Sequence, residues 1–130
     1  MLEIKGLTGG YVNIPVLKDV SFEVGDGQLV GLIGLNGAGK STTINEIIGL
    51  LTPYQGEILI DGLSLKSDRT AYRKKIGFIP ETPSLYEELT LKEHIETVAM
   101  AYDIDSQTAI DRVDKLLQIF RLKDKLDWFP

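Results

Sequence analysis

The stretch that decides the fold is Gly34-Leu35-Asn36-Gly37-Ala38-Gly39-Lys40-Ser41, which spells Gly-x-x-x-x-Gly-Lys-[Ser/Thr]. An apolar run at 29–33 leads into it, and residues 42–48 follow with the character of a helix. Strand, glycine loop and helix is the order in which this pattern binds phosphate groups. We therefore expect a bound nucleotide, ATP or GTP. The competing interpretation is a glycine-rich turn that happens to precede a lysine.

Each residue type in the loop has a physical role. The glycines permit backbone dihedrals that aim successive N–H groups inward, and the positive end of the following helix dipole lies at the same point. Lys40 can reach the β- and γ-phosphates, and the Ser41 hydroxyl can bind Mg²⁺. The predicted nucleotide-binding residues of the loop are Gly34, Leu35, Asn36, Gly37, Ala38, Gly39, Lys40, Ser41 and Thr42.

The composition excludes several other kinds of site. A net charge of −5 argues against nonspecific binding of nucleic acid, which usually needs a basic face. There are no cysteines, so disulfides and thiolate metal sites are impossible, and His94 as the one histidine leaves no histidine metal cluster. No apolar run approaches eighteen residues, and residues 1–5 are unlike a signal peptide. We expect a soluble, cytosolic chain.

The first part of the chain predicts β-structure. A short alternating run from Leu2 to Leu7 is expected to break at 8–10, and residues 16–24 alternate as a strand with one buried face. The nearly continuous apolar run at 28–33 is typical of a central parallel strand covered on both faces.

The middle of the chain alternates between short helices and strands. The helix after the loop is expected to end before Pro53. Residues 57–60 indicate a short strand, 67–75 a helical turn, and 76–79 a second buried strand.

The last third changes to helical periodicity. Thr90-Leu91-Lys92-Glu93 has the spelling of a capping box, and a further helix is expected from about Ser106. We expect Asp103 and Asp105 to end one helix and cap the next, and His94 to be a partly solvated residue on a helix face.

Over its whole length the chain resembles the nucleotide-binding subunits of ABC (ATP-binding cassette) transporters. The loop followed by Thr42 has the form common in that family. Residues 16–24 look like the cassette's antiparallel β-subdomain. Gly56-Glu57-Ile58, and then residues 76–80, resemble the approach to the family's Q-loop. Within the family, residues 79–83 and 85–90 look most like the ATP-binding subunits of Ecs-type bacterial exporters.

The resemblance implies an α/β fold, the ABC type of P-loop NTPase. An antiparallel β-subdomain is joined to part of a RecA-like parallel-sheet core and followed by the start of a helical subdomain. The expected parts of this partial ABC ATPase domain, residues 1–130, are β-subdomain and core strands at 1–33 and 54–66, the Walker A loop and helix at 34–52, the Q-loop region at 76–90, and the start of the helical subdomain at 91–130.

Two further site residues follow from the resemblance. Tyr11 stands where the family places an aromatic ring that stacks on adenine, although a tyrosine in a surface turn is the alternative. Glu81 replaces the usual Q-loop glutamine. Its carboxylate can be an oxygen ligand for Mg²⁺, or it can be a solvated loop acid. Lys40 and Glu81 are the catalytic candidates, and Ser41 and Glu81 are the metal candidates.

The family's signature sequence, acidic Mg²⁺-binding strand, catalytic glutamate and switch histidine are expected after residue 130. We therefore expect this chain to be the N-terminal part of a subunit, truncated within the helical subdomain.

The function implied is that of an ATP-binding subunit which hydrolyses ATP, with Mg²⁺, to drive a partner membrane permease. The permease is expected to dock on residues 80–102, a second ATP-binding subunit to complete a dimer, and the protein to lie on the cytoplasmic face of the cell membrane. Three alternatives stay open: another P-loop enzyme such as a kinase or GTPase, a permease-independent ABC ATPase acting on ribosomes or DNA, and a nucleotide-binding fragment without turnover.

Overall fold

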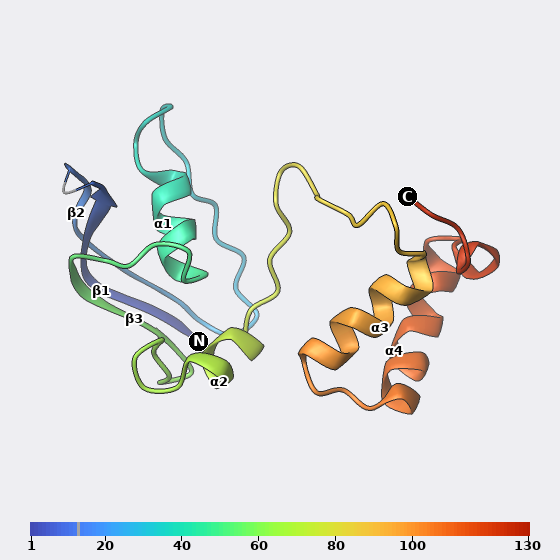
Figure 1. The fold of residues 1–130 in the computed structure, drawn as a ribbon. Helices are drawn as coiled ribbons and strands as arrows, with labels where there is room; N and C mark the ends of the chain where they lie inside the picture. The colour runs from blue at the N-terminus through green and yellow to red at the C-terminus, as the bar shows by residue number, and fades with distance from the viewer. Residues whose placement is uncertain (13) are drawn as a thin grey trace. The chain divides into compact units, whose positions relative to one another are not determined.

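The computed structural model describes residues 1–12 and 14–130. The chain divides into two compact units, Met1–Phe78 and Ile79–Pro130 (Figure 1). The elements of the first unit are β1 (Leu2–Tyr11), β2 (Ile14–Val24), α1 (Lys40–Ile47), β3 (Gln55–Ile60) and α2 (Arg69–Lys74). Those of the second are α3 (Leu91–Ala101), α4 (Ser106–Ile119) and a 3₁₀ turn, η1 (Lys123–Lys125).

The first unit is built on a three-stranded antiparallel sheet with β1 in the middle. Leu2 pairs with Val24 of β2 on one side and with Ile60 of β3 on the other. The predicted strands at 16–24 and 57–60 are confirmed, each with a longer span than the alternation alone indicated.

The core of this unit lies on one face of the sheet. Successive side chains of a strand point to opposite faces, so only one side of each strand contributes. The buried apolar side chains are Ile4, Leu7, Leu17, Ile58 and, from α2, Tyr72. The Tyr72 hydroxyl donates a hydrogen bond of 2.7 Å to the carbonyl of Ile47, which joins α2 to the end of α1.

The expected break in β1 at residues 8–10 is wrong, because the strand continues to Tyr11. Its register against β2 shifts between Ile4 and Gly10, so the glycines are absorbed as irregularities instead of ending the strand. A Cβ atom on Gly10 would lie 2.0 Å from the carbonyl oxygen of Ile14. Glycine therefore permits the close return of β2 at this point.

Two other strands are predicted, at 28–33 and 76–79. In the described residues, neither run forms a strand. Leu29 and Ile33 are almost fully exposed, as is Ile79, whereas Ile76 packs against the core. An extended segment becomes a strand only when another segment pairs with its N–H and C=O groups. Among the described residues, no segment pairs with either run.

The predicted helices and their caps are confirmed. Glu93 and Thr90 form the capping box of α3, in which the Glu93 carboxylate accepts from the Thr90 N–H at 2.8 Å. Asp105 caps α4 by accepting from the N–H of Thr108 at 2.9 Å. The helical turn expected at 67–75 is α2, capped by Asp68.

In the second unit, α3 packs against α4, and Ala99 and Leu117 are the buried apolar residues between them. The chain after α4 returns to the start of α3. The N–H of Leu91 donates to the carbonyl of Trp128 at 3.0 Å, and that of Lys92 to Leu126 at 2.9 Å. The unit is therefore held by the packing of its two helices and by hydrogen bonds that join residues near its end to the start of α3.

Candidate functional site

The candidate site is the glycine loop, residues 34–41, with the start of α1. Gly37 and Gly39 have φ values of 84° and 92°, in the left-handed region that glycine adopts at little cost. Gly39 is the N-cap of α1. The first turn of α1 has neither a side-chain cap nor an acidic residue. The first N–H groups of the helix are thus left for an outside acceptor, which favours an anion.

The Lys40 side chain forms hydrogen bonds to carbonyl groups of the glycine loop. Its ammonium group donates to the carbonyl oxygen of Gly34 at 2.6 Å and to that of Leu35 at 2.8 Å. An ammonium group has three N–H donors, so one more can point to a ligand without breaking these two bonds. The predicted cation is therefore held against the loop that is predicted to bind the anion.

Thr43 braces the same loop from the helix, a role that the sequence analysis missed. Its hydroxyl donates to the carbonyl of Gly39 at 2.9 Å, and its N–H donates to the same oxygen at 2.8 Å. A threonine four residues after the last loop glycine is a usable signal, because its hydroxyl can bond back to position i−4. Ser41 is exposed beside it, and Thr42 is buried.

The loop also rests on the sheet. A Cβ atom on Gly39 would lie 2.5 Å from Cδ2 of Leu17, so the N-terminus of α1 touches β2 directly. Leu17 is one of the core residues. The position of the loop therefore depends on a core residue that no nucleotide-binding pattern would single out.

Tyr11 lies at the end of β1 and is 45% exposed. Its hydroxyl accepts a hydrogen bond of 3.5 Å from the side-chain amide of Asn45, which belongs to α1. Tyr11 and the glycine loop are thus both attached to one helix. A half-exposed ring in this position is available for stacking on a base.

Glu81 is exposed and belongs to the second unit, whereas the glycine loop belongs to the first. Its metal and catalytic roles stay predictions. Among residues 1–12 and 14–130, no group of three or more histidine or acidic side chains could hold a metal ion.

His94 is half-buried on α3, as expected for a structural histidine. Its Nε2 accepts from the N–H of Tyr86 at 3.0 Å, which leaves Nδ1 to donate to the carbonyl of Thr90 at 2.9 Å. A ring with one accepting and one donating nitrogen is neutral. Its two hydrogen bonds attach residues 86–90 to α3.

Within the described residues, no helix has both the length and the apolar character needed to cross a membrane.

Comparison with known proteins gives a consistent result. Residues 17–128 match the family described as ABC transporter. The chain is 54% identical, over 130 residues, to the ABC-type transporter ATP-binding protein EcsA of Bacillus subtilis; the match covers 100% of this chain and 53% of that protein. It is 34% identical, over 125 residues, to the lipopolysaccharide export system ATP-binding protein LptB of Haemophilus influenzae, covering 94% of this chain and 52% of that protein.

A solved structure described as the ATP binding subunit of an ABC transporter is similar throughout. It has a TM-score of 0.94 and 52% sequence identity, and the match covers 100% of this chain and 54% of that one. The chain thus spans about half the length of the curated relatives and of the solved structure that it matches.

Proposed function

The chain belongs to the ABC transporter family, and from this membership we propose that the intact protein is an ATP-binding subunit that hydrolyses ATP to drive a membrane permease. The observation that carries the proposal is the glycine loop, with the Lys40 ammonium bonded to its carbonyl groups and a helix start without a side-chain cap beside it. Both features favour bound phosphate.

Each residue of the loop then has a stated task. Lys40 donates to phosphate oxygens and stabilises the charge on the transferring phosphoryl group, while the N–H groups of residues 37–42 hold the phosphates in place. The exposed Ser41 hydroxyl is the oxygen ligand that this loop offers to Mg²⁺. Mg²⁺, when bound, neutralises negative charge on the phosphates.

Tyr11 is proposed to stack on the adenine ring. In support, its ring is half-exposed and its hydroxyl is held by the helix that begins at the glycine loop. Glu81 is proposed to provide a carboxylate oxygen near Mg²⁺ in place of the family's usual glutamine. Its side chain is exposed, so a metal ion could reach the carboxylate.

The proposed permease-docking surface is residues 80–102. Large apolar side chains are exposed along it, and such surfaces are commonly covered by a partner. They include Leu85, Tyr86, Val98 and Met100. A second ATP-binding subunit, and a position on the cytoplasmic face of the membrane, complete the proposal. The net charge of −5 makes the alternative of a nucleic-acid or ribosome partner less favourable.

The test is Lys40→Ala in the intact protein. Removing a charge-assisted contact should weaken ATP binding by about 1.5–3 kcal/mol, measured by isothermal titration calorimetry with Mg²⁺ present. Lys18→Ala, at an exposed lysine of β2 in the same unit, is the matched control and should leave the affinity unchanged. Equal affinity for the Lys40→Ala variant and the unaltered protein would overturn the site assignment.

Residues 1–130 by themselves are expected to differ from the intact protein in ATP turnover. We propose that they bind ATP without turning it over, because the resemblance assigns water activation to residues that follow in the family's pattern. Phosphate release should equal the background rate for residues 1–130 and exceed it for the intact protein. Turnover by residues 1–130 that disappears in Lys40→Ala would contradict this.

A further inference from the structure

Glu46 is a fully buried carboxyl group in the middle of the first unit. It lies on the buried face of α1 together with Thr42 and Thr43, and 0% of its surface is exposed. Neither of its carboxyl oxygens has a hydrogen-bond partner among the residues that the structure describes. A buried, unpaired carboxylate is costly, so this side chain needs an explanation beyond packing.

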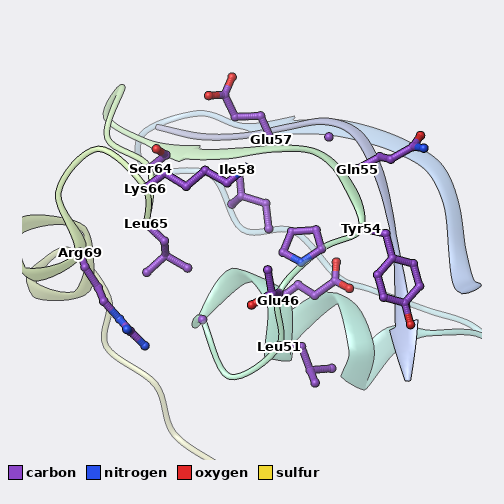
Figure 2. Close-up of a pocket in the computed structure, with 14 residues that line it drawn as sticks. Glu46, Leu51, Tyr54, Gln55, Glu57, Ile58, Ser64, Leu65, Lys66 and Arg69 are labelled. Atoms are coloured by element: carbon purple, nitrogen blue, oxygen red, sulfur yellow. The ribbon is translucent and has the colours of Figure 1, made fainter. Parts of the chain in front are cut away.

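The carboxyl group is seated on a glycine of the neighbouring strand. A Cβ atom on Gly9 would lie 1.7 Å from Oε1 of Glu46 and 2.8 Å from Oε2. The Glu46 carboxyl thus occupies the space that any other residue at position 9 would fill. Figure 2 shows the Glu46 side chain extending from α1 toward the strands. This contact sets how closely β1 approaches α1.

The contact between Gly9 and the Glu46 carboxyl, called the seat below, lies beside residues of the candidate site. Gly9 is two residues before Tyr11 on β1, and Glu46 follows Asn45, whose amide holds the Tyr11 hydroxyl. The same helix begins at the glycine loop. The distance between the proposed adenine-stacking ring and the proposed phosphate site therefore depends on how β1 sits on α1.

The charged and titratable groups around Glu46 leave it unpaired. Glu46 lines a cavity of about 430 Å³ together with Tyr54, Glu57, Lys66 and Arg69, and none of these bonds to Glu46. On β1, Lys5 pairs with Glu3, and on α2 the Tyr72 hydroxyl is bonded to Ile47. Figure 2 shows the Glu57 side chain directed away from the Glu46 carboxyl.

We infer that Glu46 is a positioning residue for the nucleotide site: its buried carboxyl group packs against Gly9 of β1 and so holds Tyr11 at the right distance from the glycine loop. Ionisation would place an unpaired charge between β1 and α1, which would weaken the contact between the strand and the helix. Nucleotide affinity would then be linked to the protonation of Glu46. This inference rests on the proposed function, because it concerns the ATP site.

The direction of the linkage follows from burial. Burial raises the pKa of Glu46, and it is the sole cause of the shift. A carboxyl with a raised pKa in the folded state binds its proton more tightly there than in the unfolded chain. The seat is therefore fully formed at low pH and weakens as the pH rises through the raised pKa. Nucleotide affinity should fall in the same direction.

The test compares the intact protein with Glu46→Gln, which keeps the shape and cannot ionise. Mg²⁺·ADP is the probe, because it uses both Tyr11 and the glycine loop without turnover. Its dissociation constant is measured by calorimetry from about pH 5 to about pH 8. The ratio of the two dissociation constants cancels the titration of the nucleotide itself. We expect the unaltered protein to lose at least about fivefold relative to Glu46→Gln as the pH rises.

The matched control is Glu57→Gln, an exposed acid of β3, which should follow the unaltered protein at every pH. Parallel pH profiles for the unaltered protein and Glu46→Gln would overturn the inference and leave the proposed function standing. Absence of Mg²⁺·ADP binding by every variant at every pH would instead overturn the proposed function.

A second measurement tests the seat directly. Gly9→Ala should weaken Mg²⁺·ADP binding, because its methyl group displaces the Glu46 carboxyl. In a Glu46→Ala background the same Gly9→Ala change should cost little, because the space is then free. An equal loss in both backgrounds would show that the contact between Gly9 and Glu46 does not position Tyr11, which contradicts the inference.

Discussion

The two units of this chain are held together in different ways. In Met1–Phe78, the core joins residues far apart in the sequence, such as Ile4, Ile58 and Tyr72. In Ile79–Pro130, two capped helices pack against each other, the end of the chain returns to the start of α3, and two apolar residues are buried. The candidate nucleotide site belongs to the first kind of structure.

The difference teaches where the site is vulnerable. The glycine loop has a local sequence pattern, but its position depends on Leu17 beneath Gly39 and on Gly9 beneath Glu46. Truncating a core side chain of the first unit should therefore also weaken nucleotide binding at the loop. Removing a helix cap in the second unit should leave nucleotide binding unchanged. Three substitutions test this contrast, in order of expected effect.

The largest effect is expected for Leu17→Ala. Truncating this buried leucine should lower the free energy of unfolding by about 2–5 kcal/mol, from lost burial and the cavity that is left. Nucleotide affinity should fall as well, because the N-cap of α1 rests on this side chain. Urea unfolding followed by circular dichroism measures the first quantity, and calorimetry the second.

Leu116→Ala in α4 is the matched control. That leucine is 51% exposed, so the same truncation should change the free energy of unfolding by about 0.5 kcal/mol or less and leave nucleotide binding unaltered. Similar losses at positions 17 and 116 would remove the contrast between the units.

An intermediate effect is expected for Tyr72→Phe. The change removes the hydrogen bond to the Ile47 carbonyl and leaves that oxygen unpaired, at a cost of about 1–3 kcal/mol in the free energy of unfolding. It should also alter the response to alkali. Burial raises the pKa of Tyr72 from 10.0 to about 12, so the folded chain retains this proton more tightly than the unfolded chain does.

The stability contributed by the Tyr72 proton is therefore complete below the ordinary pKa of 10.0 and is lost as the pH rises to about 12. Urea midpoints across this range should fall less steeply for Tyr72→Phe than for the unaltered chain. Tyr54→Phe, at an exposed tyrosine of the same unit, should keep the original slope. Identical slopes for all three proteins would refute the assignment to Tyr72.

The smallest effect is expected for Thr90→Ala, which removes the N-cap of α3. Loss of this cap should cost about 1 kcal/mol, without an effect on nucleotide binding. Thr90→Ser keeps the hydroxyl and should retain most of the stability. The hydrogen bond from the Thr90 N–H holds the pKa of Glu93 below its usual value. The stability that Glu93 contributes is therefore present when the pH is above the usual pKa of a glutamate. It is lost as the pH falls through the lowered pKa of Glu93.

Urea unfolding of the unaltered protein, Thr90→Ala and Thr90→Ser at neutral and acid pH measures the stability from the Thr90 cap and the stability from Glu93. A Thr90→Ala variant that loses as much stability as Leu17→Ala, or that binds nucleotide more weakly, would contradict the contrast between the two units.

Much of this architecture could be predicted because its signals are local. The capping box at Thr90 and the cap at Asp105 are confirmed, since a cap bonds to an N–H three residues away. The pairing of the apolar run at 28–33 could not be predicted in the same way. Its composition is that of a buried strand, but the described residues offer it no partner. Strand formation depends on another segment, and periodicity does not identify that segment.

The same distinction applies to the site. By itself, the sequence determined the glycine loop, the left-handed turns that its glycines allow, and the membership of the ABC transporter family, because these reside in contiguous residues. Only the tertiary structure decided that Leu17 supports the loop, that Tyr11 is tied to Asn45, and that the Glu46 carboxyl fills the place beside Gly9. Burial and close packing arise between residues that are distant in the chain, so no local pattern records them.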